Sequence, residues 1–245
     1  MKKVVVILQS NYLPWKGYLD LLNAADTFVL FDEVQFTRRD WRNRNKVIVG
    51  GAPKWLTIPV DSKGKYDARV DEMRIADPAW AEKHWQTVRH AYSKAPYWSE
   101  YGHLLQKLYI EADELEMLSQ VNRLFLKALA EWFGIETTLA ESTEVPRVSQ
   151  NPSERLIEIC KGMDATDYVS GPAAKAYIDR DRFAAEGIAL HYADYSGYPE
   201  YSQASTEFIH GVSAIDLLMQ TGPDARGHLK SRRAFEGVTE AVSPA

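Results

Sequence analysis

The chain has 245 residues, of which 45% are hydrophobic and 26% are charged, and its formal net charge is −5 at pH 7. These values fit one large or two small globular domains and exclude a disordered chain. The acidic pI near 5.7 argues against general nucleic-acid binding, which needs a basic face. Cys160 is the single cysteine, which excludes an internal disulfide framework and a cysteine-based zinc site.

The N-terminal region predicts a strand, a helix and a second strand. Val4–Leu8 is a short apolar run, typical of a buried strand and too short for a signal peptide or a membrane span. Apolar residues at helical spacing predict a helix over residues 15–24, and residues 27–31 predict the second strand. This order is that of a βαβ unit with parallel strands. Without a targeting segment, we expect a cytoplasmic protein.

The next elements predict a hairpin followed by helices. Two β-branched runs, residues 46–49 and 54–60, flank a Gly-Gly turn and predict a β-hairpin. Three helices are predicted over residues 79–93, 97–109 and 114–133.

Strands and helices alternate again towards the C-terminus. Strands are predicted over residues 137–139, 168–170 and 188–192, and helices over 152–161, 181–186 and 213–220. The predicted class is therefore α/β, a parallel sheet with a β-hairpin and a helical insertion. We divide the chain into an N-terminal α/β half with the hairpin (1–76), a helical segment (77–135), a C-terminal α/β half (136–236) and a frayed tail (237–245). The three segments are expected to form one continuous domain.

The segment 37–46, TRRDWRNRNK, is the strongest sign of a binding site. Its ten residues hold five positive side chains and one negative one in a chain that is acidic overall. Arg can bind phosphate or carboxylate through two parallel hydrogen bonds, and Trp offers a flat face to a base or a sugar. A solvated surface cluster is the alternative. The candidate substrate-binding residues here are Trp41, Arg42, Asn43, Arg44 and Lys46.

A second candidate site is the polar loop between the first predicted strand and its helix. Open α/β sheets bind ligands at this point, and a helix N-terminus favours anions. The arrangement is similar to that of nucleotidylyltransferases, so we expect a nucleotidylyltransferase-like sheet. Their His-x-Gly-His is replaced here by WKGY, which argues against standard nucleotidyl transfer. Simple packing of the aromatic residues is the alternative. The candidate binding residues are Gln9, Asn11, Tyr12, Trp15 and Tyr18.

Two residues are candidates for catalysis. His84 lies on a predicted helix and is the first choice as general base, because imidazole titrates near neutral pH; a lone helical histidine is more often structural. Asp32 is the reserve base at the end of the second strand. Asp32 and Glu33 could instead balance Arg38 and Arg39, and we favour that interpretation.

Two further residues are candidates for substrate binding. Ser170 precedes a Gly-Pro pair at a strand end and could offer a hydroxyl group to a ligand. Tyr198 lies in YSGYPEY, an aromatic turn that suits a sugar ring, although loop packing explains it as well. No metal-ligand spacing and no glycine-rich phosphate loop occurs in the sequence.

Seven segments of this sequence, taken together, resemble the WbqC-like family. In chain order they are QSNYLPWKGYLDLLNAAD, FDEVQFTRRDWRNRNK, WLTIPV, KHWQTVRHAYSKAPYW, SGPAAKAYID, DYSGYPEYSQ and SAIDLLMQTGP. The resemblance extends over residues 4–224. The family is named for a bacterial O-antigen gene-cluster protein, so the resemblance implies a role in surface-polysaccharide (lipopolysaccharide) biosynthesis.

The resemblance and the basic segment together predict a transferase. We expect acyl or aminoacyl transfer to the amine of a nucleotide-linked amino sugar, with an acyl donor or ATP as the second small molecule. The sequence requires no cofactor, and we expect neither nucleic acid nor a membrane span among the interactions. Two alternatives stay open: an ATP-dependent adenylate-forming or nucleotidyltransferase-like enzyme, and a non-catalytic nucleotide-sugar-binding partner of a glycosyltransferase.

Overall fold

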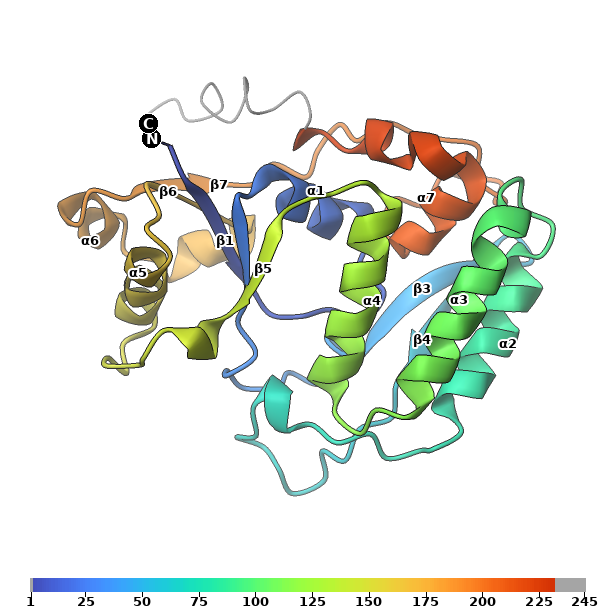
Figure 1. Cartoon of the computed structure of the whole chain (residues 1–245), viewed down its shortest axis with the longest axis horizontal. Helices are drawn as coiled ribbons and strands as arrows, with labels where there is room; N and C mark the ends of the chain where they lie inside the picture. The colour runs from blue at the N-terminus through green and yellow to red at the C-terminus, as the bar shows by residue number, and fades with distance from the viewer. Residues whose placement is uncertain (1, 232–245) are drawn as a thin grey trace.

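Five parallel strands form the central sheet in the order β5-β2-β1-β6-β7 (Figure 1). The computed structural model describes residues 2–231, so the predicted tail 237–245 lies outside the described residues. The strands are β1 (Val4–Leu8), β2 (Thr27–Leu30), β5 (Thr138–Glu141), β6 (Asp167–Ser170) and β7 (Ala189–Tyr192). The predicted α/β class and parallel sheet are confirmed, whereas the likeness to nucleotidylyltransferases stays a prediction.

The strand β1 lies at the centre of the sheet, between β2 and β6. Its side chains alternate between two hydrophobic clusters: Val4 and Val6 belong to one, Val5 and Ile7 to the other. Because both faces are covered, every position of the strand favours an apolar residue, which explains the uninterrupted run VVVIL.

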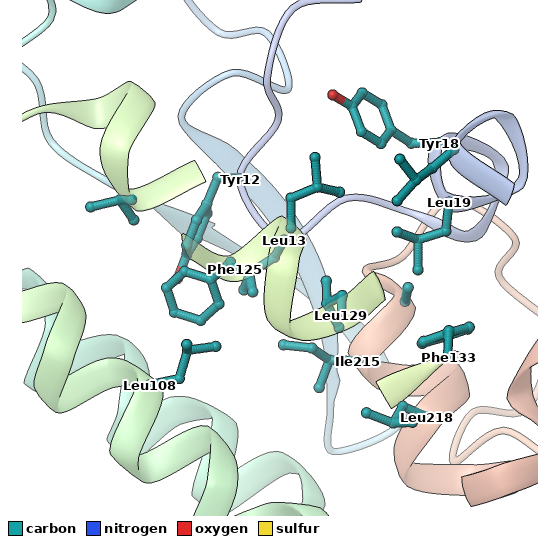
Figure 2. Close-up of a cluster of buried hydrophobic side chains, with 14 of the residues drawn as sticks. Tyr12, Leu13, Tyr18, Leu19, Leu108, Phe125, Leu129, Phe133, Ile215 and Leu218 are labelled. Atoms are coloured by element: carbon teal, nitrogen blue, oxygen red, sulfur yellow. The ribbon is translucent and has the colours of Figure 1, made fainter. Parts of the chain in front are cut away.

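The helices cover the two faces unequally. Helices α1 (Lys16–Ala24), α2 (Trp80–Tyr92), α3 (Trp98–Asp113), α4 (Leu118–Trp132) and α7 (Ala214–Thr221) contribute to the larger cluster. Figure 2 shows part of it, with Leu19 from α1, Leu129 from α4 and Ile215 from α7. Helices α5 (Pro152–Gly162) and α6 (Arg180–Ala185) cover the opposite face. The larger cluster draws residues from all three predicted segments, and the division between them stays a prediction.

The predicted hairpin forms outside the central sheet from β3 (Arg44–Val49) and β4 (Ala52–Thr57). Gly50 and Gly51 have φ values of 58° and 82°, as a two-residue hairpin turn requires. The strand β3 starts two residues before the predicted start, so Arg44 lies on a strand rather than in a loop.

The strand order reverses direction between β1 and β6. From β1 the chain builds the sheet through β2 to β5, and it returns later to add β6 and β7 on the other side. Such a topological switch point is where open α/β sheets bind ligands, outside the carboxyl ends of the strands.

Candidate functional site

The carboxyl ends of β1 and β6 bring two predicted site segments to one edge of the sheet. Val6 pairs with Val169, so the two strands end side by side. The loop 9–15 follows β1, and β6 ends at the buried Ser170, which accepts a hydrogen bond from the Tyr168 hydroxyl at 3.2 Å. The structure therefore places the loop and Ser170 together at the switch point.

The basic segment packs directly against the loop 9–15. The backbone N–H of Tyr12 donates to the Trp41 carbonyl at 3.2 Å. Asn45 is 1% exposed, and its Nδ2 donates to the Leu13 carbonyl at 2.6 Å. Leu13 has a φ of 44°, an uncommon value for leucine that needs support from its surroundings. Sequence reasoning missed Asn45, because its role depends on the conformation of a loop about thirty residues away.

Arg42 is the residue of the basic segment that lies at the switch point. Its Nη1 donates to Asn11 Oδ1, and Nη2 lies 3.6 Å from Asp40 Oδ2. The side chain is 17% exposed, and its buried Nε has no hydrogen-bond partner within residues 2–231. A largely desolvated guanidinium with a free N–H can bind an anion strongly.

The charge of Arg42 acts on three groups around it. It lowers the pKa of Tyr18, Asp32 and Tyr177, although burial is the largest effect on each group and raises the pKa. The three groups come from α1, the end of β2 and the segment after β6. Arg42 therefore supplies positive potential to the part of the carboxyl edge near β1, β2 and β6, and Tyr177, which is 63% exposed, extends this region towards solvent.

Asp32 is a buried carboxylate at the same edge. It is 5% exposed, and its Oδ1 accepts the backbone N–H of Ser10 at 2.8 Å. Burial raises its pKa, an effect opposed by the hydrogen bonds of Ser10 and the charge of Arg42. Asp32 also lines a cavity of about 230 Å³ together with Asp71, Glu141 and the first turn of α4. A carboxylate with a raised pKa beside a cavity can accept a proton from a ligand.

For Glu33 the predicted charge balance with Arg38 and Arg39 is wrong, and the arginine whose charge acts on Asp32 is Arg42. Glu33 accepts hydrogen bonds from the buried Arg155 of α5, at 2.6 Å from Nη2 and 3.0 Å from Nε. Arg38 donates instead to the Ser62 carbonyl at 2.5 Å. The partner of Glu33 is 122 residues away in the sequence, where local charge patterns give no signal.

The remaining predicted residues of the basic segment have other partners. Asn43 donates through Nδ2 to the Ile58 carbonyl at 2.8 Å, which ties the segment to the chain after β4. Arg44 Cζ lies 4.2 Å from the centre of the Trp55 ring. Lys46 Nζ lies 4.9 Å from the same ring and 5.9 Å from that of Trp41. Arg42 and Arg44 are two residues apart, a spacing that places side chains on one face of an extended segment, yet they have different neighbours.

Tyr12 and His84 meet in the interior rather than at the sheet edge. The Tyr12 hydroxyl lies 2.9 Å from His84 Nδ1 and 2.9 Å from the Tyr109 hydroxyl. Figure 2 shows the Tyr12 ring beside Phe125, apart from Tyr18. Burial lowers the pKa of His84 to about 4, so its imidazole is neutral at pH 7. This network holds the loop 9–15 from the inside, and the catalytic role of His84 stays a prediction.

The predicted aromatic residues at the start of α1, Trp15 and Tyr18, are also held in place by packing. Tyr18 is buried and donates from its hydroxyl to the Gln9 carbonyl at 3.0 Å, which fixes the start of the loop. The Trp15 ring lies 5.9 Å from that of Tyr198. Tyr198 is buried, and its hydroxyl donates to Asp20 Oδ2 at 2.5 Å. These contacts attach the segment after β7 to α1; binding of a ligand by these residues stays a prediction.

Comparisons with known proteins identify a family and a relative. The model of the WbqC-like protein family matches residues 9–228. An uncharacterized protein of Mycobacterium tuberculosis, Rv1507c, is 38% identical over 230 residues, which cover 94% of this chain and 98% of the relative. No solved structure matches the chain.

Two features are absent from residues 2–231. No helix in this range is long and apolar enough to cross a membrane. The same range contains no cluster of three or more His, Cys, Asp or Glu side chains that could hold a metal ion.

Proposed function

The chain belongs to the WbqC-like protein family, and we propose that it is a transferase of bacterial surface-polysaccharide (O-antigen) biosynthesis. Its substrate is a nucleotide-linked amino sugar, and its reaction is acyl or aminoacyl transfer to the sugar amine. The observation that carries the proposal is the desolvated Arg42 with its free Nε at the topological switch point.

The diphosphate of the substrate binds to Arg42. Asn11 and Asp40 orient the guanidinium, which keeps 17% of the side-chain surface exposed to a ligand, and its buried Nε has no partner within residues 2–231, so the charge is only partly compensated by the protein. Charge-assisted hydrogen bonds to phosphate are about twice as strong as neutral ones. A bound diphosphate would also compensate the positive potential that Arg42 creates at the sheet edge.

The sugar amine lies at Asp32. A substrate amine must lose a proton as it attacks. Asp32 is a suitable general base at this edge, because burial raises the pKa of its carboxyl group. The amine nitrogen forms a bond to the acyl carbon, Asp32 takes the amine proton, and the bond between the acyl carbon and its carrier breaks. The carrier leaves with the bonding electron pair and is protonated from solvent.

The first turn of α4 supports the developing oxyanion. Ser119 and Gln120 belong to this turn and line the same cavity as Asp32. The amide groups of a helix's first turn lack partners within the helix and favour negative charge. A preorganised donor of this kind stabilises the tetrahedral intermediate of acyl transfer.

The test is binding of nucleotide diphosphate sugars to the protein and to two variants by calorimetry. Arg42→Gln removes the charge and should weaken binding about 10- to 100-fold. Arg38→Gln is the matched control, because Arg38 is exposed and bonds to a loop carbonyl; its affinity should stay within about threefold of the wild type. Failure of the unaltered protein to bind any nucleotide sugar, or equal losses in the two variants, would contradict the proposal.

The acyl donor is either a preformed thioester-like carrier or an acid activated by ATP. Pyrophosphate release on addition of ATP and candidate acids distinguishes the two routes, because adenylate formation releases pyrophosphate and direct transfer from a carrier does not.

A further inference from the structure

The outer face of the hairpin carries two exposed tryptophans. Trp41 is 38% exposed and Trp55 is 41% exposed, although indole rings are usually more deeply buried. Lys46 pairs with Trp55 across the two strands. The neighbouring Leu56 points to the opposite, buried face. We call Trp41, Arg44, Lys46 and Trp55 the aromatic hairpin face.

The two tryptophans of the aromatic hairpin face differ in the cations that lie over them. The two indole centroids are 5.5 Å apart at an interplanar angle of 38°. Arg44 and Lys46 lie over the Trp55 ring at 4.2 and 4.9 Å, whereas the cation over Trp41 is Lys46 at 5.9 Å. Trp55 is thus the ring that both cations contact. Trp41 is similarly exposed but has one cation over it, at the longer distance, so its ring face is the less occupied of the two.

No acidic group within residues 2–231 pairs with the cations of the aromatic hairpin face; Arg44 Nη2 donates to the Arg39 carbonyl. Within residues 2–231 neither Arg44 nor Lys46 forms an ion pair, and the buried Nε of Arg44 has no hydrogen-bond partner. The nearby acid, Asp40, pairs with Arg42 instead. Cations beside exposed indole rings suit a ligand that is both planar and anionic. A simple anion would not stack on the indole rings, and an apolar ligand would not bind the positive charges.

We propose that the aromatic hairpin face binds the nucleoside end of the substrate. The nucleobase stacks on Trp41, and Arg44 and Lys46 bind the phosphate next to the ribose. This inference rests on the proposed function, since it extends the diphosphate site at Arg42 outward along the same segment. Residues 42 and 44 are at most about 7 Å apart along an extended backbone, so the two subsites are neighbours on this segment.

The experiment compares a nucleoside diphosphate with inorganic pyrophosphate, which lacks the base and the sugar. Uridine, cytidine, thymidine and guanosine diphosphates are titrated into the wild type and into Trp41→Leu, with tryptophan fluorescence and calorimetry as readouts. Trp41→Leu should weaken nucleoside diphosphate binding about tenfold, while pyrophosphate affinity changes less than about twofold. Tyr66→Leu is the matched control, because Tyr66 is an 82% exposed aromatic residue on another loop, and it should change neither affinity.

Two further variants distinguish a loss of stacking from a general loss of folded protein. Trp41→Phe retains an aromatic face and should recover most of the lost affinity. Trp55→Leu removes the support of Trp41 and should act in the same direction as Trp41→Leu. Restoration by Phe supports stacking, whereas equal losses in Phe and Leu variants overturn it.

The outcomes separate this inference from the proposed function. If the wild type binds a nucleoside diphosphate and Trp41→Leu binds it equally well, the hairpin subsite is overturned and the proposed function stands. If Trp41→Leu loses the nucleoside preference but no transfer to an amino sugar occurs, the subsite is supported and the transferase proposal fails. A wild type that binds no nucleoside diphosphate overturns both.

Discussion

Two surfaces share the six residues 41–46, and they hold polar side chains in different ways. Towards the loop 9–15, Arg42 and Asn45 are largely buried and hydrogen-bonded to Asn11 and Leu13. On the aromatic hairpin face, Arg44 and Lys46 lie against half-exposed indole rings. Buried hydrogen bonds are costly to lose, whereas exposed cation–π contacts contribute about 0.5–1 kcal/mol. The inner surface should therefore govern stability and the outer one ligand preference.

The largest stability difference should come from neighbouring residues on opposite sides of β3. Asn45→Ala leaves the buried Leu13 carbonyl without its donor and removes support for a positive φ, so it should lower the free energy of unfolding by about 2–3 kcal/mol. Lys46→Ala, on the outer face, should change it by less than about 0.5 kcal/mol. Urea denaturation of the two variants checks this contrast; similar losses would remove the distinction between the surfaces.

A smaller effect should appear in the pH dependence of stability. The pKa of His84 is lowered from 6.5 to about 4 in the folded protein, because burial disfavours its charged form. Between these values the unfolded chain binds more protons than the folded one, so stability is complete above pH 6.5 and falls as the pH drops towards 4. The expected loss is about 1–3 kcal/mol.

His84→Gln provides the comparison for that loss. Glutamine can still hydrogen-bond to Tyr12 but does not titrate, so the variant should lose about 1–3 kcal/mol less than the wild type between pH 7 and pH 4.5. Denaturant midpoints across this range give the two slopes. Parallel slopes would mean that His84 is not held neutral in the interior and that the inner network is weaker than its geometry suggests.

Local patterns in the sequence predicted most elements of the fold. The run VVVIL and the helical spacing after it identify β1 and α1, because burial on both faces of a strand and one face of a helix leaves a periodic trace. The Gly50-Gly51 pair identifies the hairpin through its positive φ values. No local pattern predicted the position of β5 beside β2, because strand order depends on contacts between segments that are distant in the sequence.

The sequence predicted the region of the candidate site but not which of its residues lie on which surface. The basic segment and the loop 9–15 both follow strands that the sequence predicts to be parallel, which favours one edge of the sheet for both, and their hydrogen bonds show that they meet. Separating Arg42 from Arg44 requires knowing that β3 begins at Arg44. Trp55 left one signal, an aromatic residue on the polar side of the alternating strand WLTIPV, but its pairing with Trp41 depends on the fold.

The most direct test of the central claim, that the switch-point edge carries the reaction, is the transfer rate of Asp32→Asn. Asparagine keeps an oxygen to accept the Ser10 N–H but cannot take the amine proton. With the nucleotide-linked amino sugar that binds best, kcat should fall about 10²- to 10⁴-fold while KM changes less than about threefold. A variant that retains kcat within threefold of the wild type would contradict the account.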